Sequence, residues 1–197
     1  MPNFYHRAGK IRFDFRNEKG QTISYDRLDN DTRKNVADTF EGLSNAMVMR
    51  DTDALIGHVG TDAAARAGAM GCVGYCMGGR HVLCAAGNFP DNFVASASLH
   101  GTLMISDRDD SPHLLANRFR GEIYCGMGSI DQHTPPALVA QMAKLLAPCA
   151  VDYSYLVHDG VNHGYALPDR DVFDKQAANR DWERIFAMFR RRLHACS

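Results

Sequence analysis

The chain has 197 residues, 45% of them hydrophobic and 23% charged, which is typical of a globular protein and allows a single domain over residues 1–197. Its formal net charge of -1 gives no electrostatic reason to expect nucleic acid or an anionic membrane as a partner. No run of about 18 apolar residues predicts a membrane span. Residues 1–7 lack the apolar stretch of a signal peptide, so we expect a cytoplasmic protein.

The cysteines do not indicate a disulfide framework, because the chain does not resemble a short secreted protein. No CxxC pair and no Cys/His cluster with structural-zinc spacing occurs in the sequence, so we expect no metal. Cys72 and Cys76 are close enough in sequence to suggest a redox pair. An ordinary buried cysteine is the stronger interpretation of Cys72, because it falls inside a predicted strand.

The first predicted elements are a strand and a hairpin. Residues 2–7 look like the end of a strand that runs into a loop. Ile11, Phe13 and Phe15 alternate with charged residues, which is the period-two pattern of a half-exposed strand. A turn after this strand would let residues 22–25 pair back onto it.

A long helical segment follows, with Asp31 or Thr32 as its predicted N-cap. Its apolar stripe has helical spacing and consists of Val36, Phe40, Leu43 and Met47. We expect a break, or the start of a second helix, at residues 51–53. A loop of small residues is predicted over residues 60–68.

The rest of the chain alternates strands with helices. We predict strands at residues 70–75, 93–99, 121–127 and 151–157, and helices at residues 78–87, 135–147 and 180–193. This alternation favours parallel crossover connections and therefore a layered α/β domain.

The motif Gly74–Gly79 follows the first of these strands and precedes a helix. Its G-x-C-x-G pattern is typical of a nucleophile elbow, a sharp turn that presents one reactive side chain. The presented residue is Cys76, and a helix N-terminus beside a histidine favours the thiolate, which is the nucleophilic form. The N–H of Met77 is the expected oxyanion-hole donor.

Two further residues follow later strands of the predicted sheet. Asp131 and His163 come after the strands at 121–127 and 151–157, and the order of nucleophile, acid and histidine is that of α/β-hydrolases. His163 would act as base and acid, and Asp131 would orient its imidazole. The predicted fold is a three-layer α/β-hydrolase type, with a mostly parallel sheet and helices on both faces.

Each of these residues also has a structural interpretation. Cys76 could be a small buried hydrophobe. Asp131 could cap the helix that begins near Pro135. His163 could be a loop histidine satisfied by local hydrogen bonds.

Three other polar residues lie near the predicted site. His100 follows the strand at 93–99, where we expect a structural or substrate-contact role. Arg80 and His81 follow the elbow, and we expect them to serve helix packing or to be exposed to solvent.

At these residues the chain resembles the dienelactone hydrolase family. The resemblance covers nearly the whole chain and is carried by residues 2–7, the elbow at 74–79, Asp131, the histidine motif at 163–166, and the closing stretch 177–193.

The resemblance implies hydrolysis of an enol-lactone or a related ester through a covalent thioester, with no cofactor and no metal. By motif position Arg7 would contact a substrate carboxylate, and Tyr75 and His100 are further expected substrate-binding residues. A second arginine of the family falls where this chain has Leu167. A broader ester or lactone substrate is therefore expected.

The resemblance also implies a departure at the start of the chain. The family's first strands and first helix, which carry its second oxyanion-hole amide, have no counterpart here, so the fold is expected to be N-terminally truncated. The strand at 70–75 would then be an open sheet edge. Either residues 10–25 or the partner in a homodimer could cover that edge.

Other functions remain open at this stage. The chain could be a catalytically impaired fragment, or a non-catalytic binding or assembly module of the same fold. A thiol redox or peroxide sensor that uses Cys72 or Cys76 is a further alternative. The ordered triad favours the enzyme.

Overall fold

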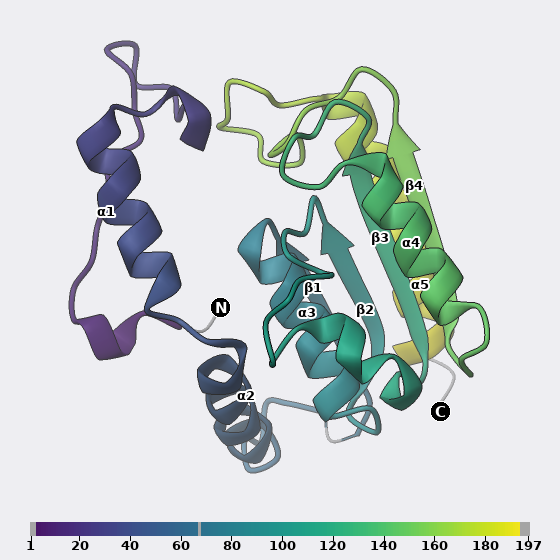
Figure 1. Cartoon of the computed structure of the whole chain (residues 1–197). Helices are drawn as coiled ribbons and strands as arrows, with labels where there is room; N and C mark the ends of the chain where they lie inside the picture. The colour runs from purple at the N-terminus through teal and green to yellow at the C-terminus, as the bar shows by residue number, and fades with distance from the viewer. Residues whose placement is uncertain (1–2, 67, 194–197) are drawn as a thin grey trace.

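The computed structural model describes residues 3–66 and 68–193, so that Pro2 and Cys196 lie outside the described residues. Its centre is a four-stranded parallel sheet (Figure 1). The strands are β1 (Met70–Tyr75), β2 (Phe93–Leu99), β3 (Glu122–Gly128) and β4 (Asp152–His158), and they lie in that order across the sheet. All three pairings are parallel.

Helices cover both faces of the sheet, which confirms the predicted three-layer α/β fold (Figure 1). One face carries α3 (Met77–Asn88), the 3-10 helix η3 (Pro112–Arg118) and α4 (Pro136–Leu146). The other face carries α5 (Lys175–Leu193). Each connection between neighbouring strands crosses over one face, as parallel strands require.

The alternation of side chains along the strands builds two core clusters. On β3, Ile123, Cys125 and Met127 face the α3 and α4 layer, whereas Tyr124 faces the α5 layer. Successive side chains of a strand point to opposite faces, so a strand that is covered on both sides is apolar throughout. All seven residues of β3 are buried, and its carboxyl end is therefore firmly placed.

The boundaries of β1 and β2 agree with the prediction, and β3 and β4 are shifted by a single position. Helix α5 begins at Lys175, earlier than the predicted start at Arg180. The reason is Asp174, whose carboxylate accepts a hydrogen bond from the N–H of Ala177 at 2.8 Å. This is the contact of an N-cap residue, which starts a helix before its apolar stripe begins.

The N-terminal helices are α1 (Asn30–Glu41) and α2 (Asn45–Val59). The predicted caps at Asp31 and Thr32 were wrong, because Asp29 accepts the Thr32 N–H at 2.8 Å. The predicted break at residues 51–53 was also wrong. It lies at residues 42–44, where Ser44 caps α2. Helix α2 packs against α3.

The predicted N-terminal hairpin is not formed. Ile11, Phe13 and Phe15 are half-buried and alternate with exposed residues as predicted, but the segment is not a strand. Only an isolated bridge joins Arg16 to Thr22 within it. A two-stranded hairpin without a third strand is marginally stable in water. Residues 3–8 form a turn and a short 3-10 helix rather than a strand end.

Strand β1 is the edge of the four-stranded sheet, as expected. Within the described ranges its only strand partner is β2, so the expected cover by residues 10–25 was wrong. That segment instead bridges to Arg170 through Thr22, near the carboxyl ends of the strands. No helix in the described part of the chain is long and apolar enough to cross a membrane.

Candidate active site

Cys76 stands at the sharp turn between β1 and α3, in the backbone conformation of φ 53° and ψ -121°. Such positive φ is unfavourable for a residue with a Cβ and is often found at functional turns. The turn requires glycine on its strand side, because a Cβ at Gly74 would lie 2.1 Å from the carbonyl oxygen of Gly78. The motif therefore folds as the elbow that the sequence predicts.

The backbone of Cys76 is fixed by hydrogen bonds on both sides. Its N–H donates to the carbonyl oxygen of Leu99 at 3.1 Å and to Nδ1 of His100 at 3.2 Å. Its carbonyl oxygen accepts from the N–H groups of Gly79 at 3.0 Å and Thr102 at 3.1 Å. The thiol is thus presented from a rigid turn.

Asp131 and His163 meet beyond the carboxyl ends of β3 and β4. Nδ1 of His163 lies 2.8 Å from one carboxylate oxygen of Asp131, whose side chain is 0% exposed. The other oxygen accepts the N–H groups of His133 at 2.8 Å and Thr134 at 3.0 Å. Asp131 does not cap α4, since the N-cap position is Pro135.

The electrostatics of Cys76 and His163 favour charge on both. Burial acts to raise the pKa of the Cys76 thiol, but hydrogen bonds from His163 and from the Met77 N–H outweigh it, and Arg170 adds a favourable charge. The pKa of Cys76 therefore lies below its ordinary value. Burial acts against the His163 imidazolium, yet Asp131 and Cys76 raise its pKa to about 9. Together these shifts favour a thiolate–imidazolium pair.

His100 lies beside this pair, with its ring centroid 4.8 Å from that of His163. It is fully buried and has a positive φ of 39°. Burial, the charge of His163 and that of Arg170 lower the pKa of His100 to about 3, so its ring stays neutral. Because Nδ1 accepts the Cys76 N–H, the hydrogen-bond network assigns the proton to Nε2. Nε2 has no hydrogen-bond partner among the described residues.

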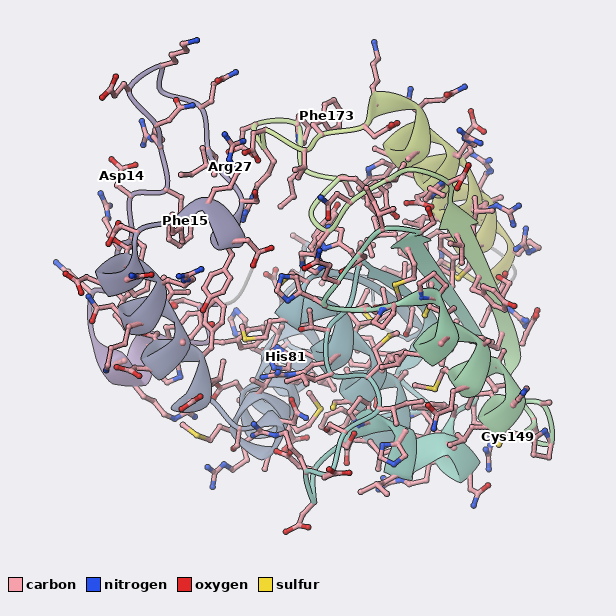
Figure 2. The ribbon with its side chains drawn as sticks, turned by 45° about the horizontal axis from the view of Figure 1, so that its top comes forward. Asp14, Phe15, Arg27, His81, Cys149 and Phe173 are labelled. Carbon is pink, nitrogen blue, oxygen red and sulfur yellow. The ribbon has the colours of Figure 1, made fainter. Side chains whose placement is uncertain are left out.

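The candidate site opens into a cavity of about 410 Å³. The strand ends form one wall, and residues 15–41 of the N-terminal segment form the other. Figure 2 shows Phe15 and Arg27 on that segment and Phe173 on the loop before α5. The residues that line the cavity from the sheet side include Cys76, Met77, Arg80, His100, Thr102, Leu103, Arg108, His133, Asn162, His163, Gly164, Leu167, Arg170 and Val172.

Polar contacts hold the N-terminal segment in place over the cavity. Asp171 accepts from the Ser24 N–H at 3.0 Å and from Arg27 at 2.5 Å. Asp26 lies 3.2 Å from Nε2 of His133, whose ring in turn lies 4.8 Å from that of His163. The cavity wall is therefore attached to the loops that carry the candidate catalytic residues.

Two expected substrate-binding residues are not brought to this cavity. Arg7 makes a two-pronged ion pair with Asp51 of α2, at 2.7 and 2.5 Å. Tyr75 ends β1 and packs with the α5 layer, its ring centroid 6.0 Å from that of His100. Neither residue lines the cavity that contains Cys76. Of the three expected substrate contacts, the structure brings only His100 to the thiol.

Sequence reasoning missed several cavity residues. His133 and Arg170 carried no signal, because their neighbours in space are distant in sequence. Arg80 and His81 were expected to serve helix packing or to be exposed to solvent, and both are buried on α3, each 4% exposed, which agrees with the first alternative. Arg80 also lines the cavity, as does Arg108.

The geometry gives little support to a redox pair of Cys72 and Cys76 or to a redox sensor that uses Cys72. Cys72 contacts the hydroxyl of Ser96 at 3.3 Å, and burial raises the pKa of its thiol to about 12. Cys72 and Cys76 are both free in the structure. No group of three or more potential ligands in the described ranges is arranged to hold a metal ion.

Comparisons with known proteins agree with this architecture. A sequence model of the dienelactone hydrolase family matches residues 1–193. A Bradyrhizobium sp. protein named "Probable 2-oxo-3-(5-oxofuran-2-ylidene)propanoate lactonase" is 26% identical over 160 residues, covering 79% of this chain and 63% of that protein. A Synechocystis sp. protein provisionally named carboxymethylenebutenolidase is 24% identical over 153 residues, covering 76% of this chain and 61% of that protein.

The fold comparison points the same way. The crystal structure of a Klebsiella pneumoniae protein provisionally described as a dienelactone hydrolase superimposes with a TM-score of 0.69 at 21% identity. The match covers 83% of this chain and 68% of that one. The chain spans somewhat less than two thirds of the length of the curated relatives that it matches.

Proposed function

Because the chain belongs to the dienelactone hydrolase family, we propose that it hydrolyses an ester or a lactone and that Cys76 is the nucleophile. The observation that carries the proposal is the Asp131–His163 pair, 2.8 Å apart, beside a thiol whose pKa is lowered. A buried cysteine with a purely structural role has no need of this arrangement, since its thiol stays protonated.

The first proposed step is acyl transfer to the enzyme. The Cys76 thiolate attacks the carbonyl carbon of the substrate, and the carbonyl oxygen takes up the negative charge. The Met77 N–H, which helps to lower the pKa of Cys76, is the proposed hydrogen-bond donor to that oxygen. His163 then gives its proton to the alkoxide that leaves, and a thioester on Cys76 remains. For a lactone, the alkoxide stays tethered to the acyl group.

The second proposed step is hydrolysis of this thioester. His163, now neutral, takes a proton from a water molecule as that water attacks the thioester carbon. The Cys76 thiolate leaves, and the imidazolium is restored beside it. Asp131 keeps the Nδ1 proton of His163 on its own side, so that Nε2 faces the chemistry throughout.

The size of the cavity and the names of the relatives favour a small substrate. A volume of about 410 Å³ lies within the range of small-molecule sites. The Bradyrhizobium relative is named as a lactonase, which supports a lactone.

Replacing the thiol tests the proposal directly. The Cys76→Ala variant should lose hydrolysis of 4-nitrophenyl butyrate, measured by release of 4-nitrophenolate, because the proposed acyl intermediate forms on this thiol. Cys72→Ala, on strand β1 just before the turn, is the matched control and should keep the activity. Undiminished turnover by Cys76→Ala would contradict the proposal, whereas a wild-type chain without turnover would favour the alternative, a non-catalytic binding module.

A further inference from the structure

A buried carboxylate that the proposed steps do not use lies between α5 and the sheet. Asp181 is 0% exposed and accepts hydrogen bonds from the hydroxyl groups of Tyr124, at 2.6 Å, and of Tyr165. Nε2 of His158 lies 2.7 Å from the same carboxylate oxygen that Tyr124 bonds. None of these three partners is more than 3% exposed. Three polar side chains therefore meet on one carboxylate inside the core.

Two of the three partners bracket the loop that carries the candidate catalytic histidine. His158 is the last residue of β4, and Tyr165 comes two residues after His163. One side chain on α5 therefore binds both ends of the loop formed by residues 159–164. The place of His163 relative to the sheet and to α5 depends on these two contacts with Asp181.

The sheet leaves room for this carboxylate at a glycine of β3. A Cβ at Gly126 would lie 2.7 Å from both carboxylate oxygens of Asp181 and from the hydroxyl of Tyr165. The carbonyl oxygen of Gly126 accepts the N–H of His100 at 2.8 Å, and Nδ1 of His100 in turn accepts the N–H of Cys76. Asp181 therefore also packs against the strand residue that supports the elbow.

Packing alone does not account for a carboxylate at this place. Taking a charged group out of water costs free energy, and replacing a buried ion pair by apolar residues of similar volume is often neutral or stabilising. Hydrogen bonds add direction, because each one holds its two groups at a set distance and angle. Nδ1 of His158 has no hydrogen-bond partner among the described residues, so the contact with Asp181 orients that ring. The other buried residues of α5 are apolar, namely Ala177, Ala178, Ile185 and Met188.

We propose that Asp181 is a positioning residue for His163, which it holds in place by binding both ends of the histidine's loop. The imidazole is thereby kept 2.8 Å from Asp131 and beside the Cys76 thiol. Asp181 touches neither the thiol nor the cavity, so it acts only through the loop. This inference rests on the proposed function and adds to it a residue on α5, on the opposite face of the sheet from the elbow helix.

Removing one hydroxyl at a time separates positioning from packing. Tyr165→Phe removes the bond to Asp181 at the end of the loop, and Tyr124→Phe removes the matching bond on β3, away from the loop. Each variant keeps its ring and loses one buried hydrogen bond to the same carboxylate, so a purely structural role predicts equal effects. Tyr165→Phe should lower kcat for 4-nitrophenyl butyrate by roughly tenfold to a hundredfold with KM nearly unchanged, because a small misplacement of a reacting group has this effect. Tyr124→Phe should keep kcat within a few fold of the wild type.

Alkylation of Cys76 by iodoacetamide, measured against pH, reports the position of His163 without any substrate. Tyr165→Phe and Asp181→Asn should both move this profile to higher pH, because a displaced imidazole stabilises the thiolate less. Loss of the negative charge of Asp181 would by itself move the profile the other way, so the direction identifies the cause. Hydrogen-exchange mass spectrometry should show faster exchange over residues 159–164 in the same two variants. Tyr124→Phe should match the wild type in both measurements.

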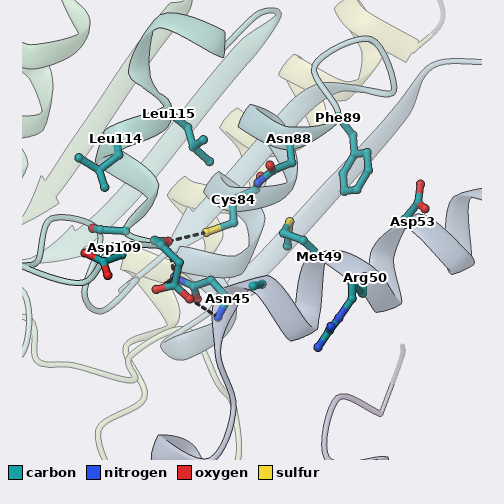
Figure 3. Close-up of a pocket in the computed structure, with 13 residues that line it drawn as sticks. Asn45, Met49, Arg50, Asp53, Cys84, Asn88, Phe89, Asp109, Leu114 and Leu115 are labelled. Atoms are coloured by element: carbon teal, nitrogen blue, oxygen red, sulfur yellow. Dashed lines mark hydrogen bonds between the residues drawn. The ribbon is translucent and has the colours of Figure 1, made fainter.

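A control on α3 shows whether any lost buried hydrogen bond has these effects. The side chain of Asn88 donates to the carbonyl oxygen of Cys84 at 2.9 Å. It lines a second cavity of about 500 Å³ (Figure 3), whose described lining residues differ from those of the candidate site. Asn88→Ala should leave kcat and the Cys76 alkylation profile unchanged.

Equal kcat values and equal Cys76 profiles in Tyr165→Phe and Tyr124→Phe would overturn the positioning role while leaving the proposed function intact. A wild type that turns over no ester would instead contradict the proposed function. The alkylation profile and the exchange over residues 159–164 then decide the positioning role, since neither needs turnover. Should Asp181→Asn fail to fold, the two tyrosine variants carry the comparison alone.

Discussion

The sheet and the N-terminal segment hold their sides of the cavity in different ways. Strands β2 and β3 are buried along almost their whole length and are paired on both edges. The N-terminal segment, residues 3–59, buries few side chains, and Val36 is the buried residue of α1. It reaches the opposite wall mainly through polar contacts, among them those of Asp171. In Figure 1, α1 stands clear of the sheet.

This contrast assigns the chemical steps and substrate access to different sides of the candidate site. Cys76, Asp131 and His163 all follow strand ends, where the parallel ladder fixes the backbone. Regions with few buried contacts open more easily than cores do. The wall made by residues 15–41 is therefore the adjustable side, and we expect it to affect substrate access more than the chemical steps.

Removing the imidazole of His163 should have the largest effect on activity, because it takes a candidate catalytic group from the sheet side of the site. His163→Ala should lower kcat for 4-nitrophenyl butyrate by about 10⁴-fold, since base, acid and thiolate partner are lost together. Stopped-flow or steady-state release of 4-nitrophenolate measures this. His58→Ala, exposed on α2, is the control. A loss below tenfold would show that His163 is not the base.

Truncating the core should affect stability by a smaller but clear amount. Ile185 is fully buried on α5, where it belongs to the core cluster between this helix and the sheet. Ile185→Ala should lower the free energy of unfolding by about 2–5 kcal/mol, measured by urea denaturation. Leu55→Ala, 39% exposed on α2, should change it little. Equal losses in the free energy of unfolding of the two variants would contradict the difference drawn between the sheet and the N-terminal segment.

Loosening the N-terminal wall should have the smallest effect. Asp171→Asn weakens the contacts with Arg27 and Ser24, and a partly exposed ion pair contributes less than about 1 kcal/mol. We expect faster amide hydrogen exchange in residues 22–27 and a KM raised by a few fold, with kcat nearly unchanged. Hydrogen-exchange mass spectrometry and steady-state kinetics measure the two. A fall in kcat without a change in exchange would place Asp171 in the chemistry.

The sequence predicts the sheet side of the molecule well. Apolar runs such as those of β1 and β2 are local patterns, and the glycines around Cys76 mark a turn that only a few residues define. The order of Asp131 and His163 after strands then follows from parallel topology. These features depend on neighbours in sequence, which is why pattern reasoning finds them.

The features that escaped the sequence depend on partners that are far apart in the chain. Phe13 alternates in burial as a strand would, but the described residues contain no neighbouring strand to pair with it. Arg7 was placed in the site by resemblance, yet Asp51 binds it elsewhere. Arg80 is buried because Asn45, on another helix, accepts its Nε–H. Such contacts become visible only after the helices are packed.

The charge state of Cys76 is the centre of this account, and alkylation with iodoacetamide measures it most directly. Peptide mapping should give a rate at Cys76 that stays high well below pH 8.5, the ordinary pKa of a thiol, because His163 and Met77 favour the thiolate. Cys149, alkylated in the same sample, is the internal reference (Figure 2). His163→Ala should move the Cys76 profile to higher pH. A wild-type Cys76 that reacts only as the pH rises through the ordinary thiol range would contradict the account.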